Sequence, residues 1–276
     1  MFDPKTKKYP FPLDTASHYI TVRKNDGTVF DADYPYIDKS RRMRMIQALT
    51  RFMLYTVVFP VARIRMGLRF EGRENLKKHR EELERGVISC SNHVHFWDFI
   101  AIMCGVRPFK PYVVSWAPNI RGENGKMLRA THCIPIPDNG DIRAVAAMNR
   151  AIKNEIQNGG WLQVYGEGSM WEYYRPIRPF KDGAAYYALH CDRPILPMAF
   201  TFRKPGWIRR RIFRQIALIT MHIGEPIYAD TSLPKDERKN DLTLRVNAEV
   251  CRLAGFAPGE NIYPPLYNRS TRIDYY

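Results

Sequence analysis

The chain has 276 residues, of which 45% are hydrophobic and 26% are charged. This balance is typical of a globular protein and excludes an intrinsically disordered or collagen-like chain. Lys and Arg number 43 against 28 Asp and Glu, so the net charge of +15 predicts an acidic partner: nucleic acid, an anionic membrane surface or an acidic carrier protein.

Residues 1–38 are polar, with scattered aromatic and Pro residues, and they predict an irregular arm with a short hairpin around the Asn-Asp-Gly sequence at 25–27. The first residues lack an apolar run of signal-peptide length, so we expect no secretion signal. The five Cys residues are odd in number and have no C-x-x-C spacing. We therefore expect reduced thiols in the cytoplasm, with neither a disulfide framework nor a zinc knuckle.

A helical pattern begins near Lys39 and runs to about Phe59. From Arg41 to Phe70 there are seven Arg residues and no acidic residue, around an apolar run of 11 residues at 52–62. Such a run is too short to cross a bilayer, which needs roughly 17–25 residues, and Pro60 is expected to end or kink the helix. Aromatic and aliphatic side chains flanked by Arg suit an amphipathic helix lying on anionic lipid headgroups. The alternative is a core helix whose Arg side chains reach solvent.

A second basic cluster lies between Arg203 and Arg214, where six cations occur without an acidic residue. It repeats the mixture of aromatic side chains and Arg seen in the first basic stretch. Nucleic-acid binding is the competing use of such charge, but the sequence has no RRM, KH, zinc-finger or basic-zipper signature. We therefore expect an anionic membrane surface as the partner, and no nucleic acid.

After Gly72 the chain alternates between short apolar runs and amphipathic segments. Strands are predicted at Val87–Ser91, Tyr112–Ser115, Cys133–Ile136, Trp161–Tyr165, Ile195–Phe202 and Ile216–Ile223. Helices are predicted at Leu76–Glu84, Asp98–Gly105, after an N-cap at Asp141, at Asp182–His190 and at Asp236–Leu253. This alternation predicts an α/β fold with a mostly parallel central sheet flanked by helices. We expect two parts: an arm and basic amphipathic helix at 1–66, and one catalytic domain at 67–276.

The strongest local signal follows the first of these strands, which ends in Asn92-His93, with Asp98 five residues after His93 at the start of a helix. Ligands of α/β sheets usually bind at the carboxyl edge of the strands. A carboxylate that holds one imidazole nitrogen fixes the tautomer and makes the other nitrogen a better base. His93 and Asp98 could therefore remove a proton from a hydroxyl, although this spacing alone also occurs at structural helix starts.

Other interpretations of the same residues remain open. His93 and His95 form an H-x-H pair that is also found in metallohydrolases, but the sequence has no later His-rich block, so we expect no metal and assign His95 to packing. Cys90 could be imagined as a nucleophile, yet its place in an apolar strand favours a buried small residue. A second signal is the turn at 166–169 after another strand, where Gly residues allow close backbone approach to a ligand; the alternative is a tight turn with a solvated Glu167.

Taken together in order, these segments resemble the glycerolipid acyltransferases, and most of all the lysophosphatidic acid acyltransferases. The blocks are Asn92-His93-(four residues)-Asp98, Ile134-Pro-Ile136, Tyr165-Gly-Glu167-Gly168-Ser169, Phe180-Lys181-Asp-Gly183-Ala and Arg193-Pro194-Ile195-Leu-Pro197-Met. The resemblance covers about residues 68–230, and ordered agreement over so many blocks is far more specific than any one of them.

The resemblance implies transfer of a fatty acyl group from acyl-CoA or acyl-carrier protein to a hydroxyl of a lysophospholipid-like acceptor, with 1-acylglycerol-3-phosphate as the main candidate. It assigns general-base catalysis to His93 and the orienting carboxylate to Asp98, without an acyl-enzyme, a metal or a further cofactor. It assigns substrate binding to Asn92, Glu167, Gly168, Ser169 and Lys181. It also implies a peripheral or monotopic protein on the inner, cytoplasmic face of a membrane.

Two departures concern the acceptor. The family often has Glu-Gly-Thr-Arg where this chain has Glu167-Gly168-Ser169-Met170, and it typically has an Arg where this chain has Asp138. Those family Arg residues are associated with the acceptor phosphate, for which a guanidinium offers paired charge-assisted donors. The alternatives are therefore a same-fold O-acyltransferase with a non-glycerophosphate acceptor, or a non-catalytic lipid- or carrier-binding protein.

Overall fold

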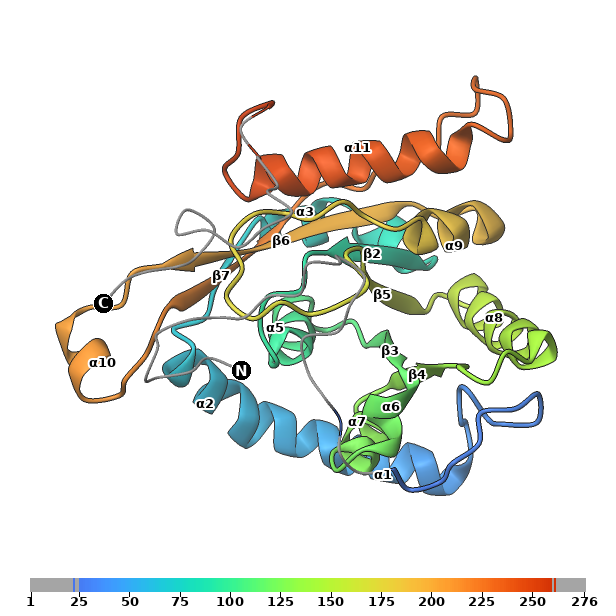
Figure 1. Ribbon diagram of the computed structural model, residues 1–276, viewed down its shortest axis with the longest axis horizontal. Coiled ribbons are helices and arrows are strands. Elements are labelled where there is room, and N and C mark those ends of the chain that lie inside the picture. The colour runs from blue at the N-terminus through green and yellow to red at the C-terminus, as the bar shows by residue number, and fades with distance from the viewer. Residues whose placement is uncertain (1–21, 23–24, 260, 262–276) are drawn as a thin grey trace.

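A seven-stranded sheet forms the centre of the molecule, and helices cover both of its faces (Figure 1). The computed structural model describes residues 22, 25–259 and 261. The strand order is β1-β7-β6-β2-β5-β3-β4, with parallel neighbours except for the antiparallel pair β6–β7. The strands are β1 (Arg69–Glu71), β2 (Val87–Ser91), β3 (Pro111–Trp116), β4 (Cys133–Ile136), β5 (Trp161–Tyr165), β6 (Ile195–Arg203) and β7 (Leu218–Ile223). The predicted α/β fold with a mostly parallel sheet is confirmed.

Helices pack on the sheet from two sides. Helix α8 packs against β5, α9 against β2 and α11 against β6, whereas α5 packs against β3 and β7. Figure 1 shows α9 and α11 on one face, with α5 and α2 on the other. The helices are α1 (Arg41–Met53), η1 (Leu54–Val58), α2 (Phe59–Arg65), α3 (Arg73–Lys78), α4 (Arg80–Leu83), α5 (Asp98–Gly105), α6 (Ala117–Arg121), α7 (Gly125–Ala130), α8 (Ile142–Gln157), α9 (Gly183–Cys191), α10 (Trp207–Arg211) and α11 (Arg238–Leu253).

Helix α8 illustrates how the sequence specifies these elements. The Asp141 side chain accepts a hydrogen bond from the Arg143 backbone N–H at 2.9 Å, as an N-cap does. Side chains four residues apart then form one buried face that packs on the sheet: Ala144, Met148, Ile152 and Ile156. The helix ends at Gln157, immediately before the Asn-Gly-Gly sequence at 158–160.

The basic N-terminal helix is longer than the sequence suggested. It runs without interruption from Arg41 to Arg65, 25 residues, and is long and apolar enough to cross a membrane by length and composition alone. Pro60 does not end it, because the chain widens into the π-helical turn η1, where the Phe59 N–H reaches the Leu54 carbonyl five residues back. A π-helical turn is a recognised way to accommodate a disturbance in the helical ladder. The expectation that this segment is too short to cross a bilayer was therefore wrong.

The end of this helix is bonded to strand β7, which pairs antiparallel with β6. The Ile219 N–H donates to the Met66 carbonyl at 3.0 Å, which ties the helix to β7. Arg209 Nη1 donates to the Ile64 carbonyl at 2.7 Å, and Gln215 Nε2 donates to the Arg65 carbonyl. These donors lie in or beside the β6–β7 connection, and they satisfy carbonyl groups that a helix end leaves without partners.

Several short elements differ from expectation. The predicted hairpin at 25–27 is not formed in the described residues 25–30, where the Asn25 and Asp26 side chains instead accept from backbone N–H groups two residues on. The rest of the predicted arm, up to residue 21, lies outside the described residues. Strand β1 and helices α6, α7 and α10 were not predicted, since runs of three to six residues carry too little periodicity. The boundary at residues 66 and 67 stays a prediction.

Candidate active site

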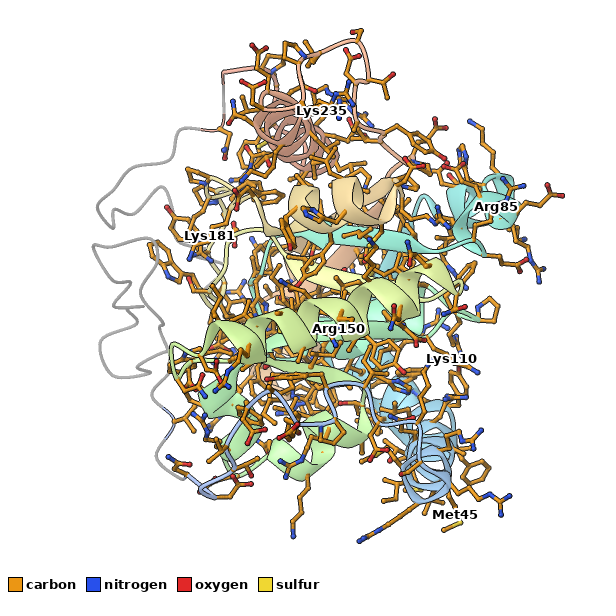
Figure 2. The ribbon with its side chains drawn as sticks, turned by 90° about the vertical axis from the view of Figure 1, so that its right-hand side faces the viewer. Met45, Arg85, Lys110, Arg150, Lys181 and Lys235 are labelled. Atoms are coloured by element: carbon orange, nitrogen blue, oxygen red, sulfur yellow. The ribbon has the colours of Figure 1, made fainter. Side chains whose placement is uncertain are left out.

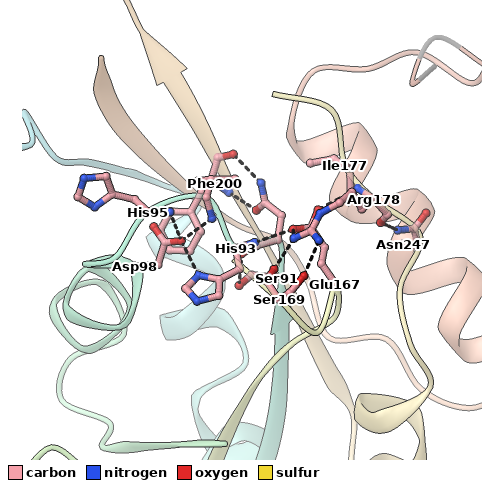
Figure 3. Close-up of polar contacts among 12 residues, drawn as sticks. Ser91, His93, His95, Asp98, Glu167, Ser169, Ile177, Arg178, Phe200 and Asn247 are labelled. Carbon is pink, nitrogen blue, oxygen red and sulfur yellow. Dashed lines mark hydrogen bonds and ion pairs between the residues drawn. The ribbon is translucent and has the colours of Figure 1, made fainter. Parts of the chain in front are cut away.

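Two predicted residues meet at the carboxyl edge of the sheet. His93 lies just beyond the end of β2, and Asp98 opens helix α5. His93 Nδ1 lies 3.0 Å from Asp98 Oδ2 (Figure 3). The His93 side chain is 21% exposed, whereas that of Asp98 is fully buried. The imidazole is thus held from inside the protein while part of its ring remains open to solvent.

The hydrogen bonds around Asp98 determine which His93 nitrogen carries the proton. Asp98 Oδ2 also accepts from the backbone N–H groups of Val94, at 2.7 Å, and His95, at 2.9 Å. A carboxylate oxygen that accepts two N–H donors is an acceptor toward the ring as well, so Nδ1 is the protonated nitrogen. His93 Nε2 is then the nitrogen with a free lone pair, as general-base chemistry requires.

Tyr165, which the sequence analysis did not assign to the site, packs against the His93 imidazole. The Tyr165 ring stacks on the His93 ring, with centroids 3.8 Å apart and an angle of 10° between the planes. Burial raises the pKa of the Tyr165 hydroxyl well above its ordinary value, so it stays neutral. Tyr165 is the last residue of β5, paired with Ser91 at the end of β2, and that register brings it beside His93.

Glu167 and Ser169 belong to a buried network around Arg178. Glu167 accepts from the His93 backbone N–H at 3.0 Å and from the Arg178 guanidinium at 2.8 Å, and its other oxygen accepts from the Arg178 backbone N–H at 2.8 Å. Arg178 Nη1 donates to Ser169 Oγ at 2.7 Å (Figure 3). The Arg178 guanidinium also lies 4.4 Å from the centroid of the Trp171 ring. Glu167, Ser169 and Arg178 are each at most 3% exposed. This network joins the turn at 166–169 to the loop that carries His93.

Lys181 lies over the turn at Gly168. Gly168 has a φ of +73°, and a Cβ atom there would lie 2.9 Å from Lys181 Nζ, so the left-handed backbone and the Lys side chain both favour Gly. The Lys181 N–H donates to the Gly166 carbonyl at 2.8 Å, which fixes its position, and its side chain is exposed. Among the predicted substrate-binding residues, Gly168 and Lys181 therefore lie on the open side of the turn.

Asn92 has a different environment from the one that substrate binding suggests. It is completely buried, and its side-chain amide donates to the Phe200 carbonyl at 3.0 Å and accepts from the Phe200 N–H at 2.8 Å. Both ends of the amide are therefore bonded to strand β6. The pair fixes the end of β2 immediately before His93.

Neither of the competing chemical interpretations gains support from the geometry. The His95 ring packs edge-on against Tyr173, its Nδ1 accepts from the Trp97 N–H at 3.1 Å, and burial lowers its pKa. Within the described residues, no cluster of three or more His, Cys, Asp or Glu side chains could hold a metal ion. Cys90 is 1% exposed, and burial raises the pKa of its thiol far above the ordinary value.

The structure also accounts for the two positions that depart from the family pattern. Asp138 forms a double ion pair with Arg121, with both N–O distances at 2.7 Å, and this pairing lowers the pKa of the Asp138 carboxyl. Met170 is buried. Among the cations near these positions, Arg121 is thus paired with Asp138, and Arg178 is enclosed with Glu167.

Comparisons with known proteins find one family model that matches part of the chain. No curated protein sequence matches it. A structural match is the 1-acyl-sn-glycerophosphate (LPA) acyltransferase PlsC from Thermotoga maritima, with 16% sequence identity, a TM-score of 0.47 and coverage of 80% of this chain and 86% of that chain. Residues 67–201 match the family model described as Acyltransferase, and this range includes His93, Asp98, Glu167 and Lys181. Residues 67–201, just under half of the chain, are therefore similar to the acyltransferase family.

Proposed function

We propose that this acyltransferase moves a fatty acyl group from the thioester of acyl-CoA or acyl-carrier protein to a hydroxyl of a lysophospholipid-like acceptor, with 1-acylglycerol-3-phosphate as the first candidate. The observation that carries the proposal is the 3.0 Å contact between His93 Nδ1 and Asp98 Oδ2 within the family domain. The reaction in this proposal needs no cofactor beyond the thioester co-substrate.

In the proposed reaction, His93 Nε2 takes the proton of the acceptor hydroxyl while the hydroxyl oxygen attacks the thioester carbonyl. A carbon–oxygen bond forms, the carbon–sulfur bond breaks, and the proton passes from His93 to the departing thiolate. Asp98 holds the ring in the productive tautomer and stabilises the imidazolium that forms. Tyr165 restricts the tilt of the ring through stacking. No covalent acyl-enzyme is needed, because the base acts on the substrate itself.

The residues around the turn divide into two proposed roles. Lys181 and the Gly168 backbone lie on its open side, and we assign them to the acceptor, with the Lys181 ammonium as a donor to its phosphate. Glu167, Ser169 and Asn92 have their polar groups bonded inside the protein, so they act by positioning the loop that carries His93. This division refines the sequence prediction, which assigned all five residues to substrate binding.

An acceptor panel tests the proposed function. The full chain is incubated with radiolabelled acyl-CoA or acyl-carrier protein and either lysophosphatidate or the matching monoacylglycerol, which lacks the phosphate. We expect kcat/KM to be about tenfold or more higher for lysophosphatidate, since a charge-assisted hydrogen bond contributes about 1.5–3 kcal/mol. Lys181→Gln should reduce this preference, whereas Arg175→Gln on the same loop should not. Transfer only to phosphate-free acceptors would support a different acceptor class, and transfer to none would support a non-catalytic binding protein.

We further propose that the protein acts at the inner, cytoplasmic face of a membrane, as a peripheral or monotopic protein. Exposed apolar side chains line the helix from α1 to α2 and recur in and after α10. They are Met45, Leu49, Phe52, Val57, Val61 and Ile64 on the helix, and Trp207, Ile208, Ile212 and Phe213 near α10. The contact between Arg209 and the Ile64 carbonyl joins the two groups into one surface, here called the basic apolar surface. Apolar side chains mixed with Arg are the composition that anionic lipid interfaces attract.

Charge reversal at the start of this helix is expected to weaken binding to vesicles that contain an anionic phospholipid. Arg41, Arg42 and Arg44 are exposed, and each cation near an anionic surface contributes about 1 kcal/mol. Changing all three to Glu should therefore weaken co-sedimentation with vesicles by about 100-fold or more at low salt. Raising the ionic strength should weaken vesicle binding by the parent protein in the same way.

The matched control removes the same charge from other elements. Lys77, Lys153 and Lys235 are exposed and lie on or near α3, α8 and α11, away from the basic apolar surface. Reversing all three should leave most of the vesicle affinity. Equal losses in both triple variants would mean that net charge, and not this helix, determines binding.

A further inference from the structure

The His93 ring has a second neighbour besides Asp98. Asp98 contacts the edge of the ring at Nδ1, whereas the Tyr165 ring covers one face, with centroids 3.8 Å apart and an angle of 10° between the planes. Tyr165 reaches this place because it ends β5 and is paired with Ser91 at the end of β2. Edge and face are thus held by different elements, and the acceptor must approach from a side that neither residue covers.

A ring face in this position distinguishes the two charge states of His93. The face of an aromatic ring carries partial negative charge, so it attracts a cation that lies within about 6 Å of its centroid. The neutral imidazole gains little from that charge, whereas the imidazolium formed when His93 takes the acceptor proton gains more. An interaction that is stronger after proton transfer than before it lowers the barrier. At 3.8 Å, the Tyr165 ring lies well inside this range.

The Tyr165 hydroxyl does not explain the presence of this side chain. Its oxygen is buried and has no hydrogen-bond partner among the described residues. Burial, and then the nearby Asp98 carboxylate, raise the pKa of this hydroxyl well above its ordinary value, so it carries no charge. A buried hydroxyl without a partner costs free energy. The useful part of the side chain is therefore the face of its ring.

Other titratable groups lie around His93 and can also act on its charge. Asp98 comes from α5, and Glu167 accepts from the His93 N–H but is held in a buried ion pair of its own. Burial lowers the pKa of His95, which leaves that ring neutral at neutral pH. Burial raises the pKa of Glu172 on the next loop. A test of the Tyr165 ring must therefore leave all four of these groups in place.

We propose that Tyr165 is a positioning residue whose ring face stabilises the imidazolium of His93, beyond restricting the tilt of the ring. The inference rests on the proposed function, because it concerns the imidazolium that forms when His93 takes the acceptor proton. No bond of Tyr165 forms or breaks: the proton passes from the acceptor to His93 and then to the departing thiolate, and Tyr165 lowers the free energy of the state between these transfers. A ring of the same shape without a negative face would lose this effect.

Fluorinated phenylalanines at position 165 of the full chain test the proposal with almost no change in the shape of the ring. Tyr165→Phe is the reference: it keeps the face, so kcat for acyl transfer should stay within about twofold of the parent value. Replacing one, three and then all five ring hydrogens of this Phe with fluorine withdraws negative charge from the face step by step. We expect kcat to fall in the same order, by about 3- to 30-fold in total. Equal kcat throughout the series would overturn the proposal.

NMR titration of the His93 ring gives a second readout that needs no substrate and no turnover. In the pentafluorinated variant the ring should take up its proton at a pH lower by about half a unit or more than in Tyr165→Phe, because its charged form is less stabilised. The acid limb of the kcat/KM profile should move in the same direction, since a protonated ring cannot act as a base. An unmoved titration would contradict the proposal. A shifted titration together with normal turnover in His93→Ala would support the contact and overturn the proposed function instead.

A second pair of Tyr and His rings provides the matched control. The Tyr112 ring meets His132 edge-on, with centroids 4.9 Å apart and an angle of 78° between the planes. Figure 2 shows Lys110, two residues before Tyr112, on the opposite side of the molecule from Lys181. The same fluorinated residues at position 112 should leave kcat and the titration of the catalytic imidazole unchanged. Circular dichroism checks that both series are folded. An equal fall of kcat at positions 112 and 165 would show a general effect of fluorine and would refute the role of Tyr165.

Discussion

Replacing His93 with Ala should lower kcat for acyl transfer by about 10²–10⁴-fold, the range that a positioned general base typically contributes. The side chain is 21% exposed, so its loss opens little buried space and the fold should survive. The contacts of the His93 ring with Asp98 and Tyr165 disappear. Within the described residues, no other imidazole forms a hydrogen bond with the Asp98 carboxylate that could replace them. Steady-state transfer from a radiolabelled acyl thioester measures the effect, and circular dichroism confirms that the variant is folded.

Two further variants separate catalysis from general damage. His190→Ala removes an exposed imidazole from α9 and should leave kcat unchanged. Asp98→Asn should lower kcat less than His93→Ala does, because the ring remains but its tautomer is no longer imposed by a carboxylate. Substantial residual turnover in His93→Ala would remove His93 from its proposed role. An unchanged pH–rate profile in Asp98→Asn would contradict the coupling between the two residues.

Replacing Arg178 with Met should lower the free energy of unfolding by about 3–5 kcal/mol, as breaking a buried ion pair from one side usually does. Glu167 would then be left as an unpaired carboxylate in a site where both residues are at most 3% exposed. Ser169 Oγ and the Trp171 ring would lose their contacts with the guanidinium. Denaturant unfolding followed by far-UV circular dichroism gives the change in stability.

The matched control for this prediction is Arg175→Met, which removes an exposed Arg three residues earlier on the same loop and should change stability by less than about 0.5 kcal/mol. Adding Glu167→Gln to Arg178→Met should restore part of the loss, because no unpaired charge remains buried. A loss below about 1 kcal/mol in Arg178→Met, or no recovery in the double variant, would show that the fold does not depend on the ion pair between Glu167 and Arg178.

Much of the fold could be predicted because the strands of a largely parallel sheet are buried on both faces and appear as short apolar runs. The bounds of β2, β4 and β5 agree with the prediction to the residue. The meeting of His93 with Asp98 was also predictable, because both lie in one strand–loop–helix unit only five residues apart. Local sequence is enough to describe contacts of this kind.

The parts that could not be predicted depend on contacts between segments distant in the sequence. Glu167 resembles a solvated turn residue, yet it is buried by an Arg 11 residues later and by the loop after β2. Asn92 belongs to a motif that was assigned to substrate binding, but its side-chain amide is hydrogen-bonded to the backbone of Phe200, 108 residues away. Stacking of Tyr165 on His93 follows from the pairing of β5 with β2. The sequence of a single strand does not predict which strand lies beside it in the sheet. The continuation of the basic helix past Pro60 depended on a π-helical turn that has no clear sequence signature.

The joint between the basic helix and β7 has a mechanical consequence. The Met66 carbonyl is bonded to Ile219 of β7, β7 is paired along its length with β6, and Phe200 of β6 clamps Asn92 beside His93. A continuous chain of hydrogen bonds thus runs from the helix to the residue before the imidazole, with no flexible linker between them. If the helix lies on a bilayer, the domain cannot rotate freely relative to the membrane. The depth of the helix in the bilayer then determines the distance and the orientation of His93 relative to the lipid surface.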